Sequence, residues 1–190
     1  MPMHIQQWFP INNAFTQAEC DRAQKLCDTV SLAHGGVIGD LPIWQQRLAR
    51  NVKSGWILSD EADPDTLWLF KKFMQLADDV NKRTFQFEID HVEALHYLEY
   101  GFGQHYVKHV DNGSDAVAAR KLTLVLQLSH GNEYLGGNLS IDSQARSRHA
   151  PRGRGSVAIF PSHLPHKAGH VWFGKRKALV AWINGKKPLS

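Results

Sequence analysis

The sequence is poor in cysteine, which argues against a fold held together by disulfide bonds. Only Cys20 and Cys27 occur among its 190 residues, and they fall seven positions apart in a segment that we expect to be one helix. That spacing places them about 10 Å apart along the helix axis, whereas a disulfide needs Cα atoms within about 7 Å of each other. We therefore expect two small buried thiols and, without a disulfide framework, a cytoplasmic location.

Long apolar runs and a strong net charge are also missing. No run approaches the roughly 18 apolar residues of a membrane-spanning helix, and the first residues lack the basic start and apolar stretch of a secretory signal, so we expect no membrane partner. The 22 Lys and Arg against 18 Asp and Glu give a net charge of +4. Because nucleic-acid-binding proteins usually carry a denser basic stripe, we interpret the basic run at 146–154 as a solvated loop and do not favour nucleic acid.

Aromatic residues, in contrast, are abundant. Nine Phe, six Trp and four Tyr exclude a disordered chain, and a chain of this length can bury roughly 70% of its unfolded surface. We expect a single domain over residues 1–190, with a helical support region over 1–83 and a β region over 84–185. The sequence makes no prediction of the oligomeric state.

Two helices are predicted in the first region. Over residues 16–30, Thr16 and Glu19 have the spacing of a capping box, and the apolar positions keep to one face. Over residues 63–81, Asp63 is a suitable N-cap and Pro64 suits the first helical position. Between them, residues 31–62 show no clear period, apart from a short strand expected near residues 56–58.

After residue 83 the hydrophobic period changes from 3.6 to 2, which predicts strands. Alternation is clear at 85–89 and at 122–128 and weaker at 157–159 and 179–183. Glycine-rich turns separate these runs, as expected for a β-sandwich or barrel. We expect the two helices to cover one face of the sheet.

Histidine is over-represented, with eleven residues. His109 and Asp111 lie two positions apart, so on a strand their side chains point the same way and can share a divalent metal. A third ligand must come from elsewhere, and His163, His166 and His170 compete for that place.

The next cation favours His166. Arg176 follows it by ten residues, and an arginine can hold a carboxylate through two charge-assisted hydrogen bonds. Two histidines and one carboxylate form the facial triad of non-heme iron(II) oxygenases, which leaves metal positions open. A dicarboxylic cosubstrate, bound by the metal at one end and by Arg176 at the other, would explain both features.

Together with the sequence around them, these residues make the C-terminal half resemble the iron(II)- and 2-oxoglutarate-dependent oxygenases, specifically the prolyl 4-hydroxylase-like branch. That branch carries a tyrosine, a Gly-Gln or similar pair, a second tyrosine and then His-x-Asp. The matching positions are Tyr100, Gly103, Gln104, Tyr106, His109 and Asp111.

The second half of the family pattern is present as well. The family's distal histidine is followed by Lys or Arg and then by Trp, as His166 is followed by Arg176 and Trp182. The likeness covers about residues 84–185. Two positions depart from it: Asn138 stands for the usual glutamate, and Gln127 stands where the prolyl hydroxylases often have tyrosine.

The resemblance implies a fold and a role for each of these residues. The fold is α+β and mainly β: a double-stranded β-helix, also called a jelly roll and cupin-like, with N-terminal helices packed on one sheet. The implied iron ligands are His109, Asp111 and His166. The implied contacts to 2-oxoglutarate are Arg176, Tyr100 and Thr123. The implied substrate contacts are Arg120, Tyr106 and Trp182.

The resemblance also implies an activity. It is a dioxygenase reaction that uses Fe(II), 2-oxoglutarate and O2, with ascorbate as a further candidate cofactor, and that hydroxylates a C–H bond while 2-oxoglutarate is decarboxylated to succinate. A prolyl residue in a protein or peptide is the first substrate expected. The alternatives are the same chemistry on a free amino acid, another small molecule or a nucleic acid, and a non-catalytic metal-binding β-barrel. Arg176 argues against the β-barrel, because a structural metal site needs no carboxylate clamp.

Overall fold

The computed structural model describes residues 8–35, 42–114, 117–143 and 146–186. Three helices and fourteen strands lie in these ranges. The helices are α1 (Gln17–Asp28), α2 (Ile43–Ala49) and α3 (Pro64–Asn81). The strands are β1 (Phe9–Ile11), β2 (Ala33–His34), β3 (Arg50–Asn51), β4 (Lys53–Ile57), β5 (His91–Tyr100), β6 (His105–His109), β7 (Arg120–Gln127), β8 (Tyr134–Gly136), β9 (Leu139–Ser143), β10 (Arg146–His149), β11 (Val157–Pro161), β12 (His166–Ala168), β13 (Val171–Gly174) and β14 (Arg176–Asn184).

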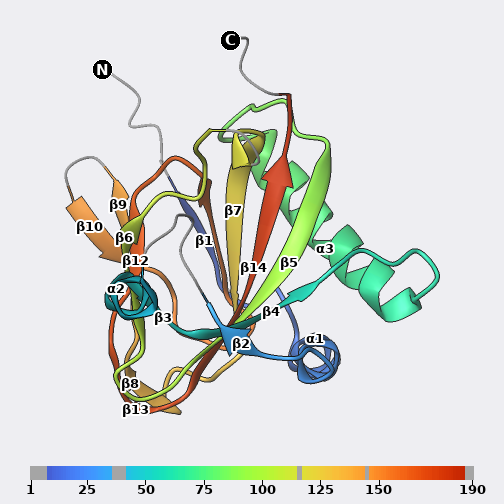
Figure 1. Ribbon diagram of the computed structural model, residues 1–190. Coiled ribbons are helices and arrows are strands. Elements are labelled where there is room, and N and C mark those ends of the chain that lie inside the picture. The colour runs from blue at the N-terminus through green and yellow to red at the C-terminus, as the bar shows by residue number, and fades with distance from the viewer. Residues whose placement is uncertain (1–7, 36–41, 115–116, 144–145, 187–190) are drawn as a thin grey trace.

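The strands form two facing antiparallel sheets and a small ribbon. The large sheet has the order β1-β11-β7-β14-β5-β4-β2, the smaller one has the order β10-β9-β12-β6-β3, and β13 pairs with β8. In Figure 1 the smaller sheet stands to the left of the large one. Strands β1 to β4 come from the N-terminal region, so the described part of that region adds strands to both sheets as well as helices.

Both predicted helices are present, and local capping explains where they begin. The Thr16 hydroxyl accepts from the backbone N–H of Glu19, whose carboxylate accepts from the backbone N–H of Thr16, so the capping box is complete. Asp63 caps α3 and Pro64 begins it. The short helix α2 is not predicted by the sequence, and two of its large apolar side chains, Trp44 and Leu48, are exposed.

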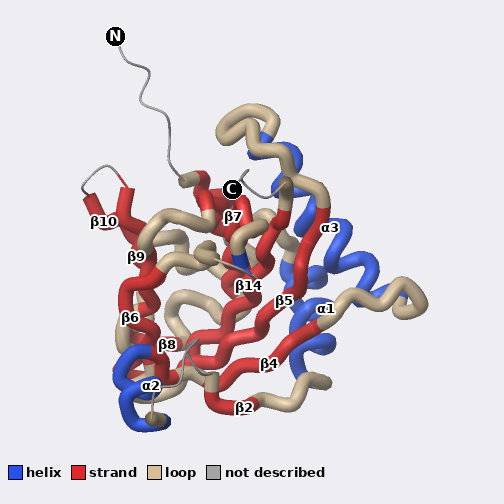
Figure 2. Tube along the Cα trace, turned by 45° about the horizontal axis from the view of Figure 1, so that its top comes forward, coloured by secondary structure: helices blue, strands red, loops and turns tan. Residues whose placement is uncertain are grey.

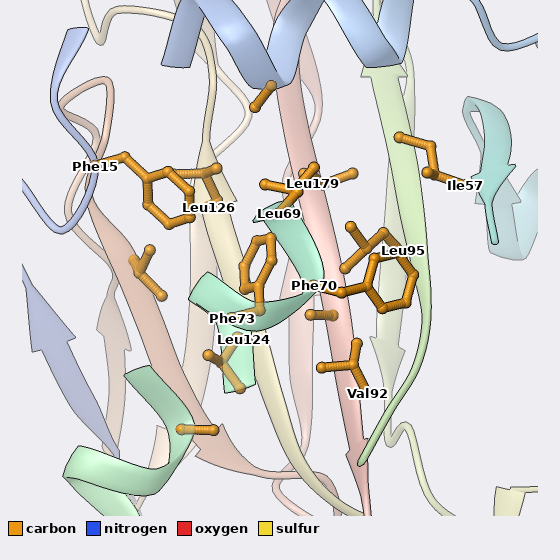
Figure 3. Close-up of a cluster of buried hydrophobic side chains, with 14 of the residues drawn as sticks. Phe15, Ile57, Leu69, Phe70, Phe73, Val92, Leu95, Leu124, Leu126 and Leu179 are labelled. Atoms are coloured by element: carbon orange, nitrogen blue, oxygen red, sulfur yellow. The ribbon is translucent and has the colours of Figure 1, made fainter. Parts of the chain in front are cut away.

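The predicted strands at 122–128, 157–159 and 179–183 correspond to β7, β11 and β14. Alternation along β14 places Leu179, Ala181 and Ile183 in one buried cluster, while Val180 and Trp182 belong to a second cluster on the opposite face. The first cluster lies against α1 and α3, which cover that face (Figures 2 and 3). The second face is left for the cavity between the sheets.

The strand predicted at 85–89 is wrong. Residues 86–90 belong to no strand, and β5 begins only at His91. The side chain of Asn81 bonds both the N–H and the carbonyl of Phe87, and Gln86 has a φ of +57°. The apolar side chains still pack against the helix-covered cluster, so the alternation reflects burial without a sheet partner.

Both cysteines are free and buried, as expected. Burial raises the pKa of the Cys27 thiol to about 12, so this thiol stays protonated and unreactive at neutral pH. Within the described ranges, no helix combines the length and apolar character needed to cross a bilayer.

Gly155 occupies a backbone position where an added side chain should lower the stability of the fold. Gly155 has a φ of +84°, and an added Cβ would lie 2.2 Å from the carbonyl oxygen of Phe15. Gly103 has a similar φ of +72° but nothing within 4 Å of an added Cβ, so it is a matched control. We expect Gly103→Ala to lower the free energy of unfolding by about 1–2 kcal/mol and Gly155→Ala to lower it by roughly 1 kcal/mol or more beyond that. Urea denaturation of both variants measures this, and equal losses would contradict it.

Candidate active site

A cavity of about 510 Å³ lies between the two sheets. Strands β5, β7 and β14 of the large sheet and β6, β9 and β12 of the smaller sheet all contribute lining residues. The side chains that face it belong to the second face of the large sheet, opposite the helices. Residues far apart in the sequence therefore reach one enclosed space.

Strand pairing brings the three predicted metal ligands together. His109 ends β6 and His166 begins β12, and the two are register partners. Asp111 follows β6 directly, and its N–H donates to the carbonyl of Ser162 at 2.9 Å. The Nε2 atoms of His109 and His166 lie 3.5 and 3.4 Å from the two carboxylate oxygens of Asp111. One ligand atom from each residue lies within 4.8 Å of the others, a spacing that one divalent ion can bridge.

Hydrogen bonds behind the ligands fix how they point. Nδ1 of His109 is 2.8 Å from the carbonyl oxygen of Val107, and Nδ1 of His166 is 3.0 Å from that of Leu164. Each Nδ1–H therefore donates to a carbonyl, which leaves the Nε2 lone pair for a metal. The Thr123 hydroxyl donates to Oδ2 of Asp111 at 2.8 Å.

The charges also suit metal ligation. Burial alone would raise the pKa of Asp111, but His166, His109 and the Thr123 hydroxyl together hold the pKa well below its ordinary value. Burial, aided by His109, lowers the pKa of His166 although Asp111 opposes the shift. An ionised carboxylate beside a neutral imidazole is the protonation state that a metal requires, so the donor set fits iron(II).

Neither competing histidine takes part. His163 and His170 are exposed, and His170 stacks instead between His105 and Trp172. Of the three candidates, the structure brings only His166 to the pair at 109 and 111.

Arg176 lines the same cavity and is 2% exposed. Its Nε donates to Oε1 of Gln127 at 3.2 Å, and its guanidinium carbon lies 5.3 Å from the ring centre of Tyr100. In the part of the chain that the structure describes, no carboxylate forms an ion pair with it. A buried guanidinium without an anion is costly, so this end of the cavity is suited to a bound carboxylate.

Of the other two predicted cosubstrate contacts, Tyr100 lines the cavity and Thr123 does not. Tyr100 is buried and lines the cavity, and burial raises the pKa of its phenol although Arg176 acts in the opposite direction. The phenol therefore stays protonated and can donate a hydrogen bond. Thr123 is not among the cavity-lining residues, and its hydroxyl is occupied by Asp111 and Ser162. The structure thus places Thr123 behind Asp111, a predicted metal ligand, whereas the resemblance implied a pocket contact.

All three predicted substrate contacts line the cavity. Arg120 holds the carboxylate of Glu93 through two hydrogen bonds of 2.8 and 2.6 Å, and its guanidinium carbon lies 3.8 Å from the ring centre of Trp182. The ring of Tyr106 stacks on His109 with centres 3.5 Å apart. Tyr106 thus lies directly against a predicted metal ligand.

The contributors that the sequence-based prediction misses include His96, Trp56 and Glu93. His96 lines the cavity and lies four residues before Tyr100 on β5, so the two-residue period of a strand could have placed both on one face. Trp56 stacks on His96 across the β4–β5 pair. No local pattern could have revealed that contact or the Glu93–Arg120 pair.

Comparison with known proteins agrees with this geometry. The sequence model of the 2OG-Fe(II) oxygenase superfamily matches residues 95–184. PKHD-type hydroxylases of Prochlorococcus marinus are similar: that of strain MIT 9211 is 36% identical over 92 residues and that of strain MIT 9313 is 32% identical over 93 residues. These matches cover 48% and 49% of this chain and 42% of each relative, so the chain spans less than half the length of these relatives.

Solved structures show the fold. A Pseudomonas putida prolyl-4-hydroxylase superimposes with a TM-score of 0.72 at 17% identity, over 95% of this chain and 93% of that one. A Trichoplax adhaerens prolyl hydroxylase, in complex with a hypoxia inducible factor oxygen degradation domain peptide fragment, gives a TM-score of 0.76 at 19% identity, over 94% and 84%. The predicted jelly roll with helices on one sheet is therefore confirmed. The fold is therefore similar to that of these prolyl hydroxylases, and residues 95–184, which contain the converging His, Asp and His side chains, match the 2OG-Fe(II) oxygenase superfamily.

Proposed function

We propose that this protein is an iron(II)- and 2-oxoglutarate-dependent dioxygenase that hydroxylates a prolyl residue in a protein or peptide. The observation that carries the proposal is a single cavity with two features: the triad His109, Asp111 and His166, and a buried Arg176 without a carboxylate partner among the described residues. A dicarboxylic oxo acid would satisfy both at once. The similarity to PKHD-type hydroxylases and to a prolyl hydroxylase solved with a bound peptide supports the same proposal.

In this proposal His109, Asp111 and His166 hold the iron, and Arg176 with Tyr100 holds the far carboxylate of 2-oxoglutarate. When bound, iron, 2-oxoglutarate and O2 supply the oxidising chemistry, in which decarboxylation to succinate is coupled to hydroxylation of a C–H bond. The chain's own groups position these partners. The carbonyls of Val107 and Leu164 would keep each ligand imidazole in the required tautomer.

Gln127 fits this arrangement. Its amide oxygen accepts from Arg176, which fixes the amide so that its NH2 group points elsewhere. Gln127 therefore still orients the Arg176 guanidinium, although it stands where the family often has tyrosine. Arg176 remains available for a carboxylate through its other N–H groups.

The proposed reaction is tested on the wild-type protein. Incubated with Fe(II), 2-oxoglutarate and a proline-containing peptide pool, the protein should form succinate and add one oxygen atom to a proline-containing peptide, as read by mass spectrometry. In a second incubation with free proline in place of the peptides, the proline should not be modified. Oxygen added to free proline and to no peptide would support the small-molecule alternative instead.

The ligand assignment predicts a selective loss of metal binding. His109→Ala and Asp111→Ala should each weaken Mn(II) binding, measured by calorimetry, and abolish succinate formation, because two ligands cannot hold the ion against water. His163→Ala is the matched control, since His163 is an exposed histidine three residues from His166. It should bind Mn(II) as the wild type does, and a loss as large as in His109→Ala would disprove the assignment.

The carboxylate clamp predicts a separate effect on the cosubstrate. In Mn(II)-loaded protein, Arg176→Gln should weaken 2-oxoglutarate binding by roughly 100-fold, because two charge-assisted hydrogen bonds are lost, while Mn(II) affinity is retained. The control is Arg154→Gln, because Arg154 pairs with Asp21 on α1 and is not a cavity residue. Unchanged 2-oxoglutarate affinity in Arg176→Gln would contradict the clamp.

A further inference from the structure

A second hollow lies beside the active-site cavity. This groove, of about 820 Å³, passes the outer edge of β4 and is lined on its other side by residues of the segment 26–35. The groove and the cavity share Arg50, Trp56 and His96. A ligand that fills the cavity can therefore extend into the groove without leaving the protein surface.

An aromatic surface connects the two hollows. The ring centres of Trp56 and His96 are 4.1 Å apart with planes 8° from parallel, and Trp182 lies 5.5 Å from Trp56 and 5.6 Å from His96. Trp182 and His96 are buried, while Trp56 is 49% exposed. Burial, aided by Arg50, lowers the pKa of His96 to about 3. The surface from Trp182 to Trp56 is thus itself uncharged at neutral pH.

Trp182 provides an unused donor at the start of this surface. Its indole N–H is buried and has no hydrogen-bond partner among the residues that the structure describes, although Trp182 lines the cavity and is only 6% exposed. A buried donor without an acceptor is destabilising, and such groups in native proteins call for an explanation. A carbonyl oxygen of a bound ligand would satisfy it.

At the other end of this aromatic surface, the edge of β4 offers main-chain N–H and carbonyl groups for hydrogen bonding. Strand β2 pairs only with Lys53 and Ser54, and no strand in the described ranges pairs with the outer side of Gly55–Ile57. Val30 and Ser31 lie where a Cβ of Gly55 would point, so they pack on the helix-covered face of the sheet and not along this edge. An open edge of this kind can accept an extended peptide as an added strand.

We propose that this groove docks the polypeptide segment next to the reacting residue, in extended conformation. One main-chain carbonyl of that segment accepts from the Trp182 indole, its side chains pass over His96 and Trp56, and its main chain pairs with the free edge of β4. The proposal rests on the proposed hydroxylase function and deepens it: the target residue is recognised within an extended chain, and length of chain is part of the recognition.

The experiment compares two peptide pools of different length. Protein loaded with Mn(II) and 2-oxoglutarate is immobilised, and blocked tripeptides and blocked decapeptides, each with one central proline, are passed over it. Retained peptides are quantified by mass spectrometry for the wild type, Trp56→Ala, Trp56→Phe and Trp172→Ala. Trp172 is the matched control because it is an exposed tryptophan, 57% accessible, that stacks on a histidine outside the groove.

We expect the wild type to retain decapeptides more strongly than tripeptides. Trp56→Ala should reduce decapeptide retention by roughly three- to ten-fold, with little change for tripeptides, while Trp56→Phe and Trp172→Ala keep the length preference. Equal retention of both pools by the wild type, or a full length preference in Trp56→Ala, would overturn the proposal.

A parallel measurement separates this proposal from the proposed reaction. Succinate formation with Fe(II) is measured on the same wild-type preparation. If succinate forms but peptide length has no effect on retention, the docking proposal is wrong and the dioxygenase proposal stands. If retention depends on length but no succinate forms, the docking proposal is supported and the proposed reaction is wrong.

Decapeptides that are N-methylated at alternate residues test the edge pairing directly. Retention should fall for only one of the two methylation patterns, because only alternate N–H groups of an added strand face β4. Retention of both at the unmethylated level would exclude edge pairing.

Discussion

The pairing of β6 with β12 is the interaction on which the site depends. It sets His109 opposite His166, although the two are far apart in the sequence. The loops beside these strands are also tied together, because the N–H groups of Asp111 and Asn112 both donate to the carbonyl of Ser162. Main-chain hydrogen bonds therefore fix the spacing of the three ligands. The side chains need only the local contacts to Val107, Leu164 and Thr123 to point inward.

The same cavity keeps two buried charges of opposite sign. Asp111 stays ionised because two imidazoles and a hydroxyl surround it, and Arg176 is buried against the neutral groups Gln127 and Tyr100. Among the residues that the structure describes, this cation has no carboxylate partner, which has a cost in stability. An anionic ligand that binds there recovers this cost, so the protein should gain stability with the proposed 2-oxoglutarate bound.

Local and periodic patterns were sufficient for much of this structure. The capping residues of α1 and α3 act within one turn, and the alternation in β7, β11 and β14 reflects one covered face, so both are written in short segments of sequence. The spacing from His166 to Arg176 singled out one histidine of three, because β12 and β14 present both residues to the same cavity.

The errors and omissions arise from contacts that the pattern of apolar residues does not report. The alternation at 85–89 resembles a strand, but the Asn81 side chain takes the main-chain groups of Phe87 that a neighbouring strand would need. Thr123 was expected in the pocket, yet its hydroxyl turns to Asp111. Trp56 reaches His96 only because β4 joins the sheet beside β5. None of these contacts follows from the period of the apolar residues.

Cations near the site also bear on the choice of substrate. Arg120 at the cavity wall is neutralised by Glu93, so it presents a flat surface over Trp182 and little free charge. In the basic run, Arg152 donates to the carbonyls of Gly131, Tyr134 and Gly136, and Arg154 pairs with Asp21. These two arginines hold loops together, so their guanidinium groups are already occupied within the protein. The uncharged aromatic wall thus supports the proposed prolyl substrate over a nucleic acid.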